Sequence, residues 1–160
     1  MTTTTTRSQR HRLRVFVYGT LREGYGNHRL LARAIDEGRA SRVGGHARTE
    51  RPATLVNVGW FPAITTLHAG PCSVVGELYS VDDQTLAELD RLEGVPRLYT
   101  RERVRVAVSV DDARGMGAFV TTVPALTYVW AGEAEGLDAV PSGDFGDVRA
   151  PSPIADPFLW

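Results

Sequence analysis

The chain has 160 residues, 42% of them hydrophobic and 23% charged, which is ordinary for a soluble globular protein of one domain. Its formal net charge of −1 gives no indication of a nucleic-acid partner or of binding to an acidic lipid surface. All 18 basic residues are Arg, and the absence of Lys excludes Schiff-base chemistry and a P-loop.

The N-terminal residues 1–12 contain five consecutive Thr followed by several Arg, without the apolar core of a secretory signal. We predict a disordered tail there, with organelle targeting as the less favoured alternative. Cys72 is the only cysteine, so an internal disulfide is impossible and a cytoplasmic location is expected. The sequence has no run of 18 apolar residues, so we predict no membrane span.

The first half of the chain predicts one helix among short strands. Residues 13–18 are rich in Val, Phe and Tyr, which favour a buried strand. Asn27 is a candidate N-cap for a helix that ends at Gly38. Short strands are predicted at residues 41–47, 53–58 and 63–66, with a turn at 59–62 between the last two.

The second half predicts longer strands around a second helix. A strand over residues 74–81 precedes a helix that Asp82 or Asp83 caps and that Gly94 ends. Long strands follow at residues 99–110 and 118–130, with a turn at 114–117. Pro124 interrupts the last strand, which indicates a bulge or an edge position.

These elements favour an α+β fold, a small and mostly antiparallel β-barrel with flanking helices. A doubly wound parallel sheet is the alternative, and it is less favoured because helices do not follow every strand. The chain becomes rich in Pro and Gly near its end, so we expect little regular structure from Gly143 onward. The predicted domain therefore spans residues 13–147, and residues 148–160 form an irregular C-terminal segment.

Glu93 is the candidate acid/base residue. At 100° per residue it projects between Leu86 and Leu89, in a stripe that also contains Leu92. An apolar setting and the negative end of a helix dipole both raise the pKa of a carboxylate toward the range that a general base needs. The alternative is that the last helical turn frays and leaves Glu93 solvated.

The turn that follows the first strand is a candidate ligand loop, formed by Tyr18, Gly19, Thr20 and Leu21. Glycine allows the backbone to approach a ligand closely, and successive free N–H groups bind a carboxylate or an oxyanion. An ordinary turn between a strand and a loop explains the same residues. The spacing of the glycines does not fit a dinucleotide-binding motif.

The remaining chemically interesting residues give weaker signals. Cys72 has no adjacent base and fits a structural role better than a nucleophilic one. The four His are scattered without the spacing of a metal site, so no metal is expected. Tyr99 and Tyr128 lie within predicted strands, where core packing is the default interpretation. Residues 60–62 are predicted to form part of the core or a pocket wall. Three alternate arginines of one predicted strand are expected on its solvated face: Arg101, Arg103 and Arg105.

Several of these segments, taken in order, resemble the γ-glutamylcyclotransferase superfamily. They are residues 15–22, Asn27-His28, Gly76-Glu77-Leu78-Tyr79, Leu89-Asp90-Arg91-Leu92-Glu93-Gly94, Tyr99-Thr100-Arg101 and Ser142-Gly143-Asp144-Phe145. The pattern is most similar to the γ-glutamylamine cyclotransferase and AIG2-like subgroup, which includes a butirosin-pathway enzyme. The opening segment and the block around Glu93 are together fairly specific.

The resemblance implies a cofactor-free enzyme. In the family reaction the α-amine of a small γ-glutamyl substrate attacks its own γ-carbonyl, which gives 5-oxoproline and releases an amine. The family's catalytic glutamate falls on Glu93, and its substrate loop falls on residues 18–21. Tyr99 and Tyr128 complete the candidate substrate-binding set.

Two other functions use the same sequence features differently. A non-catalytic module with this fold binds a γ-glutamyl compound or an amino acid without turnover, although pure binding does not need a desolvated carboxylate. A partner-binding barrel that uses its Arg-rich tail binds no small ligand. The sequence gives neither the leaving amine nor the oligomeric state.

Overall fold

The computed structural model describes residues 12–59, 61–111, 115 and 117–147. Its helices are α2 (His28–Asp36), α3 (Asp83–Leu92) and the short 3-10 helix η1 (Phe145–Asp147). Its strands are β1 (Leu13–Val17), β2 (Ala40–Arg42), β3 (Ala47–Thr49), β4 (Thr54–Asn57), β5 (Pro62–Thr66), β6 (Val75–Val81), β7 (Tyr99–Asp111), β8 (Ala118–Trp130) and β9 (Asp138–Ala139). The predicted N-terminal tail up to residue 11, Trp60, most of the turn at 114–117 and the C-terminal segment lie outside the described residues.

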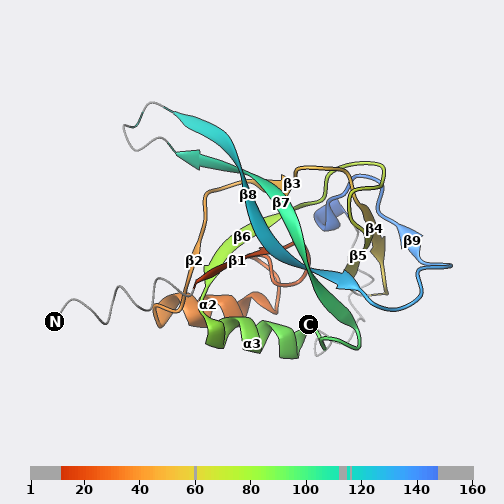
Figure 1. The fold of residues 1–160 in the computed structure, drawn as a ribbon, viewed down its shortest axis with the longest axis horizontal. Coiled ribbons are helices and arrows are strands. Elements are labelled where there is room, and N and C mark those ends of the chain that lie inside the picture. Colours follow the sequence, from red (N-terminus) through yellow and green to blue (C-terminus); the bar gives the residue numbers. More distant parts are fainter. Residues whose placement is uncertain (1–11, 60, 112–114, 116, 148–160) are drawn as a thin grey trace.

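The strands form one nine-stranded sheet with the order β1-β6-β3-β7-β8-β5-β4-β9, and β2 pairs with β6 (Figure 1). Among the described strands, β1–β8 and β5–β8 are the parallel pairs, and the others are antiparallel. Because β8 also pairs with β1, the path of strand pairings returns to its first strand. The predicted α+β class and antiparallel character are confirmed, and the doubly wound alternative is wrong.

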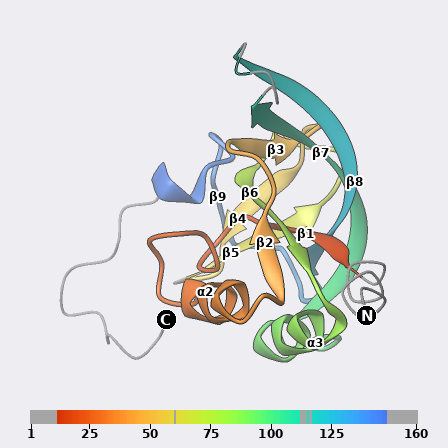
Figure 2. The same ribbon diagram turned by 90° about the vertical axis from the view of Figure 1, so that its left-hand side faces the viewer.

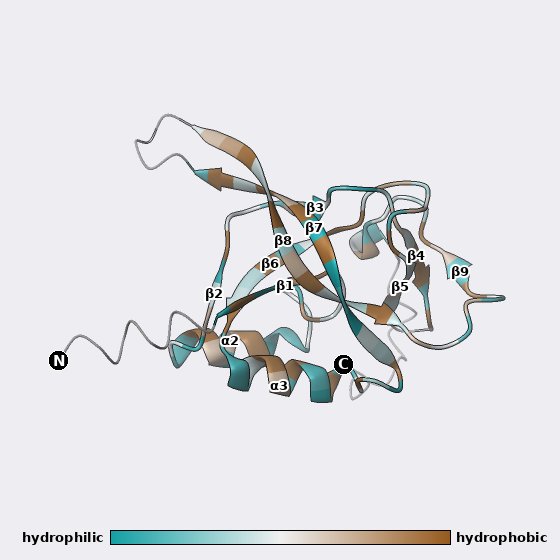
Figure 3. Ribbon diagram, viewed as in Figure 1, coloured by the Kyte–Doolittle hydropathy of each residue, from teal (hydrophilic) through white to brown (hydrophobic). Residues whose placement is uncertain are grey.

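Helices α2 and α3 lie side by side on one side of the sheet (Figures 1 and 2). One apolar cluster fills the space around them, with Val15, Leu31, Tyr79 and Leu89 fully or almost fully buried. The alternate residues of the strands form a second cluster around Phe16, which includes Leu78 and Val106. The change between hydrophobic and hydrophilic residues along α3 and β8 is visible in Figure 3.

One predicted strand is corrected by the structure. The strand expected over residues 41–47 is two strands, β2 and β3. Gly44 separates them, with a φ of +66° and no room for a Cβ, which would lie 2.4 Å from the carbonyl oxygen of Ser109. A glycine is therefore required at this break.

Pro124 does not cause a bulge, because β7 and β8 pair without a shift of register from Tyr99↔Trp130 to Asp111↔Ala118. The pairings on the other side of β8 are at Leu126 and Val129. Pro124 lies before them and opposite Arg105 of β7, so the predicted edge position fits the described strands.

Candidate active site

A pocket of about 150 Å³ opens where the loop after β1 faces the end of α3 and the start of β7. All seven residues that the sequence singles out as site candidates line it: Tyr18, Gly19, Thr20, Leu21, Glu93, Tyr99 and Tyr128. Phe16, Val17, Asn27, Phe61, Pro62, Leu92 and Leu98 complete the lining. The structure therefore brings the predicted set together, while the role of each residue stays a prediction.

Glu93 follows the last residue of α3, and its N–H donates to the carbonyl of Leu89 at 2.9 Å. Its side chain is partly buried, and no described residue forms a hydrogen bond or an ion pair with its carboxylate. Burial raises the pKa of Glu93 to about 7. The alternative prediction, a frayed helix end that leaves the Glu93 carboxylate freely solvated, does not fit this environment.

The predicted stripe beside Glu93 is right for two leucines and wrong for the third. Leu86 and Leu89 are buried, but Leu92 is 42% exposed. Leu92 instead lies at the mouth of the pocket together with Leu98, which is 50% exposed. Glu93 thus lies between a closed apolar core and an open apolar rim.

The Tyr18 hydroxyl is bonded into the sheet behind the pocket. It donates to the carbonyl of Tyr128 at 2.6 Å and accepts from the N–H of Ile64 at 3.0 Å. Burial, with a smaller contribution from Tyr99, raises the pKa of Tyr18 well above its usual value. The phenol is therefore neutral at physiological pH and does not serve as a base.

The other two tyrosines also line the pocket, and the hydroxyl of each is hydrogen-bonded within the protein. Tyr99 donates to the carbonyl of Pro62 at 2.8 Å, and Tyr128 donates to Oδ1 of Asp90 at 2.8 Å. Burial is the main cause that raises the pKa of both tyrosines. Asp90 also pairs with Arg101, whose Nε lies 3.1 Å from the same oxygen. Arg101 is exposed, as predicted, and this ion pair adds a contact with α3 that the prediction did not include.

The loop after β1 approaches the opposite wall closely at Gly19. A Cβ on this residue would lie 2.6 Å from Cγ of Pro62, so the approach requires glycine. A hydrogen bond from the N–H of Arg22 to the carbonyl of Gly19 closes the turn at 3.1 Å. No described residue accepts a hydrogen bond from the N–H of Thr20 or Leu21, which leaves two donors at the pocket.

Asn27 supports this loop in a way that the sequence analysis did not predict. It occupies the N-cap position of α2, but its side chain makes no capping hydrogen bond. Its Nδ2 donates to Oγ1 of Thr20 at 2.9 Å instead, and Nδ1 of the neighbouring His28 lies 2.9 Å from the carbonyl oxygen of Leu21. The predicted N-cap position of Asn27 is right, but its side chain does not cap the helix, because its amide bonds to Thr20 of the loop instead.

Five further residues line the pocket without having been site candidates in the sequence: Phe16, Val17, Asn27, Leu92 and Leu98. Phe61 and Pro62 line the pocket, as the pocket-wall interpretation of this segment predicts. Within the described ranges, no three His, Cys, Asp or Glu side chains are grouped so that they could hold a metal ion. No described helix has the length and the hydropathy that a membrane crossing requires.

The chain is similar to proteins of one family over most of its length. The family model described as gamma-glutamyl cyclotransferase, AIG2-like, matches residues 15–147. The gamma-glutamylaminecyclotransferase of Bos taurus is 39% identical over 119 residues, which cover 72% of this chain and 68% of the relative. The protein of the same name from Rattus norvegicus is 35% identical over 124 residues, with 74% and 80% of the two chains covered.

A solved structure of an AIG2-like protein from Mus musculus has a similar fold. It matches with a TM-score of 0.64 and 29% sequence identity, over 82% of this chain and 87% of the mouse chain. The matched segment of the family model includes every residue that lines the pocket. The chain therefore belongs to the AIG2-like gamma-glutamyl cyclotransferase family.

Proposed function

We propose that the chain is a γ-glutamylamine cyclotransferase, which converts a γ-glutamylamine into 5-oxoproline and a free amine. One observation carries the proposal above all others. Among the described residues that line the pocket, Glu93, with its pKa raised to about 7, is the one whose side chain ionises near neutral pH. The names of the relatives from Bos taurus and Rattus norvegicus support the same reaction.

Glu93 is the general base and then the general acid in this proposal. Its carboxylate takes a proton from the substrate α-ammonium, and the resulting amine attacks the γ-carbonyl carbon. The new bond from nitrogen to carbon closes the five-membered ring, and the bond from carbon to the leaving nitrogen breaks. Glu93 returns its proton to that nitrogen, then takes the second proton from the ring nitrogen and passes it to the departing amine. The amine therefore leaves as an ammonium ion, and the carboxylate is regenerated.

The loop after β1 holds the substrate in this mechanism. Among the described residues no cationic side chain lines the pocket, so in this proposal a bound α-carboxylate depends on N–H donors. We assign this role to the N–H groups of Thr20 and Leu21, which have no acceptor among the described residues. Fixing the carboxylate and the γ-carbonyl at two ends of a small pocket favours the folded substrate that ring closure needs.

The rim of the pocket supports an amine as the leaving group. Leu92, Leu98 and Phe61 offer apolar surface, and the described part of the lining has no cation that would pair with a leaving group that carries a carboxylate. A γ-glutamylamine with an alkyl chain matches this rim better than a γ-glutamyl peptide does.

We also propose that the sheet closes like a barrel. The pairing of β8 with β1, which returns the path of strand pairings to its first strand, supports this closure.

The test separates cyclisation from hydrolysis by following the nucleophile. A γ-glutamyl alkylamide is incubated with the enzyme in water enriched in heavy oxygen, beside its N-acetyl derivative as the matched control. The expected products are unlabelled 5-oxoproline and the amine, and the N-acetyl compound is expected to be inert. Glutamate that carries solvent oxygen as the first product would refute the proposal, as would saturable binding without turnover.

A further inference from the structure

Two segments from distant parts of the chain meet at the loop of residues 18–27, called the first loop below. One is Gly76-Glu77 on β6, and the other is Asp144-Phe145 at the start of η1. Both belong to the motifs that carry the family resemblance, yet neither Glu77 nor Asp144 lines the pocket. The proposed reaction leaves them without a role.

Glu77 holds the middle of the first loop. Its Oε1 accepts hydrogen bonds from the N–H of Glu23 and from the hydroxyl of Tyr79, both at 2.8 Å. The Glu77 side chain is 13% exposed. The Arg42 guanidinium lies between the two carboxylates, 3.9 Å from Oε2 of Glu77 and 3.0 Å from Oε2 of Glu23. A half-buried carboxylate that accepts a backbone N–H fixes the position of that peptide strongly.

The glycine before Glu77 makes this contact geometrically possible. Glu77 pairs with Val17, the last residue of β1, and the first loop begins at the next residue. A Cβ on Gly76 would lie 2.4 Å from the carbonyl oxygen of Val17. Strand β6 therefore approaches the root of the loop as closely as a backbone permits.

Asp144 holds the same loop at Arg22. Its Oδ1 accepts from NH1 of Arg22 at 3.0 Å and from the N–H of Gly146 at 2.8 Å. The Arg22 guanidinium also lies over the Tyr25 ring at 5.4 Å, and that ring packs on Phe145 with 5.9 Å between ring centroids. The Arg22 side chain is 14% exposed, so this pair is shielded more than an ordinary surface ion pair.

The two anchors share one support, because the N–H of Val75 on β6 donates to the carbonyl of Gly143 at 2.9 Å. We propose that Glu77 and Asp144 are positioning residues that hold the first loop in its substrate-binding shape. The loop consists of successive turns closed at Gly19, Arg22 and Tyr25, and it has no strand partner of its own. Ordering it in advance removes an entropic cost from substrate binding.

The inference rests on the proposed function and predicts a separation of KM from kcat. The loop supplies the N–H donors, whereas Glu93 follows α3, so loosening the loop weakens binding without moving the base. Losing one charge-assisted hydrogen bond of this kind raises KM about tenfold, while kcat changes by less than about twofold. The acid limb of the kcat profile, which Glu93 governs, keeps its position.

The experiment compares Asp144→Asn, Glu77→Ala and the conservative Glu77→Gln with a matched control. The control is Glu50→Gln, which removes the exposed pair between Arg105 and Glu50 at 2.9 Å on another part of the sheet. Each variant is measured for KM and kcat with a γ-glutamyl alkylamide and for the affinity of 5-oxoproline. Hydrogen exchange of the peptide covering residues 19–25 is recorded without ligand, so one readout does not require turnover.

The expected result has four parts. In Asp144→Asn and Glu77→Ala, KM rises and the affinity for 5-oxoproline falls by about the same factor, and hydrogen exchange in residues 19–25 accelerates. Glu77→Gln restores part of the loss seen in Glu77→Ala. The double variant Arg22→Gln/Asp144→Asn is expected to be no worse than either single variant. A fall in melting temperature with unchanged KM and unchanged exchange would overturn the inference. A wild type that forms no 5-oxoproline would refute the proposed function instead, and the exchange data would still decide the role of the anchors.

Discussion

Replacing Glu93 with Gln tests the chemistry and the electrostatics of the pocket in one variant. The change keeps the size of the side chain and removes its charge. Without the proposed general base, turnover is expected to fall by at least about a hundredfold. The fold is expected to remain intact and to become more stable at neutral pH, because the partly buried charge is gone.

The size of the stabilising effect follows from the pKa of Glu93. Burial raises it from 4.5 to about 7. At about 1.4 kcal/mol per pKa unit this shift corresponds to about 3 kcal/mol, and screening of the partly exposed carboxylate reduces the expectation to about 2 kcal/mol. Ionised Glu93 thus opposes folding, and its neutral form does not.

The sign of the pH dependence is fixed by which state holds the proton. Between pH 4.5 and about 7 the folded chain keeps the Glu93 proton while the unfolded chain has lost it. The wild type therefore loses stability relative to Glu93→Gln as the pH rises through this window, and the two converge at lower pH. Above the window the difference stays constant.

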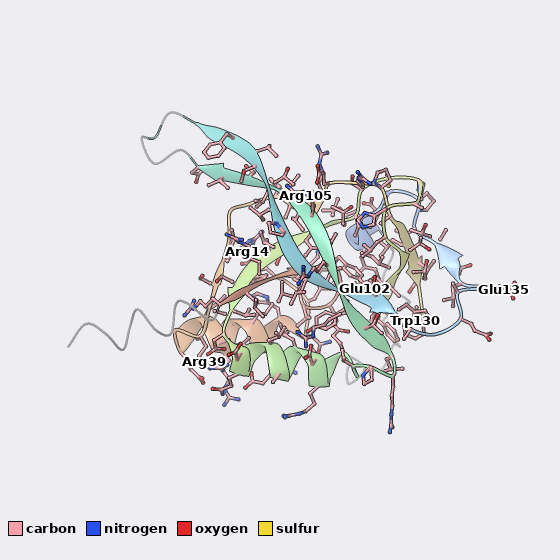
Figure 4. All side chains as sticks on the ribbon, in the orientation of Figure 1. Arg14, Arg39, Glu102, Arg105, Trp130 and Glu135 are labelled. Carbon is pink, nitrogen blue, oxygen red and sulfur yellow. The ribbon has the colours of Figure 1, made fainter. Side chains whose placement is uncertain are left out.

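Urea unfolding of both proteins at about pH 4 and about pH 8 measures this difference directly. Glu102→Gln is the matched control, since exposed Glu102 lies on β7 and does not line the pocket (Figure 4). The wild-type kcat/KM is expected to rise with pH through about 7, where Glu93 ionises. Equal stability of wild type and Glu93→Gln at both pH values, or near wild-type turnover in the variant, would refute the reasoning.

Three further changes test other parts of the pocket. Gly19→Ala places a Cβ 2.6 Å from Cγ of Pro62, so KM is expected to rise and the unfolding free energy to fall by about 1–3 kcal/mol; a wild-type KM would contradict the close approach. Leu98→Asp is expected to lower kcat/KM for substrates with an alkylamine leaving group and to raise it for those with a cationic one, and Leu98→Asn is its uncharged control. The cost in stability is expected to be small, because Leu98 is half exposed. An unchanged ranking of substrates would contradict a role of Leu98 in the choice of leaving group. Deleting residues 1–9, which contain no apolar residue after Met1, is expected to leave the melting temperature and turnover unchanged, and a drop of many degrees would show that the segment belongs to the folded unit.

Features that depend on neighbours in the sequence could be predicted well. Asp82 caps α3 as expected, with Oδ1 accepting from the N–H of Thr85 at 2.8 Å. The alternation of Val104, Val106 and Val108 places all three in the core. Glu93 could be singled out because helical periodicity and the family pattern select the same residue.

Features set by contacts between distant segments could not be predicted from local patterns. Asn27 has the chemistry of a helix cap, but the nearby Thr20 hydroxyl takes its amide. Leu92 has the spacing of a core residue, but α3 ends there and leaves it at the pocket rim. The ion pair of Arg101 with Asp90 joins β7 to α3; strand periodicity correctly places that arginine on the exposed face but does not indicate its partner.

The hydroxyl of Tyr18 has a consequence for how this pocket can change during evolution. One side-chain oxygen bridges the peptide groups of Ile64 on β5 and Tyr128 on β8, so it replaces a rung of the backbone ladder between two parallel strands. Replacing Tyr18 with phenylalanine would remove the hydrogen-bond partner of the buried Ile64 N–H and of the buried Tyr128 carbonyl. The end of the pocket beside Tyr18 is therefore resistant to mutation, whereas the exposed rim at Leu92 and Leu98 tolerates exchange. New leaving groups are expected to be acquired at the rim, while recognition of the γ-glutamyl moiety stays constant.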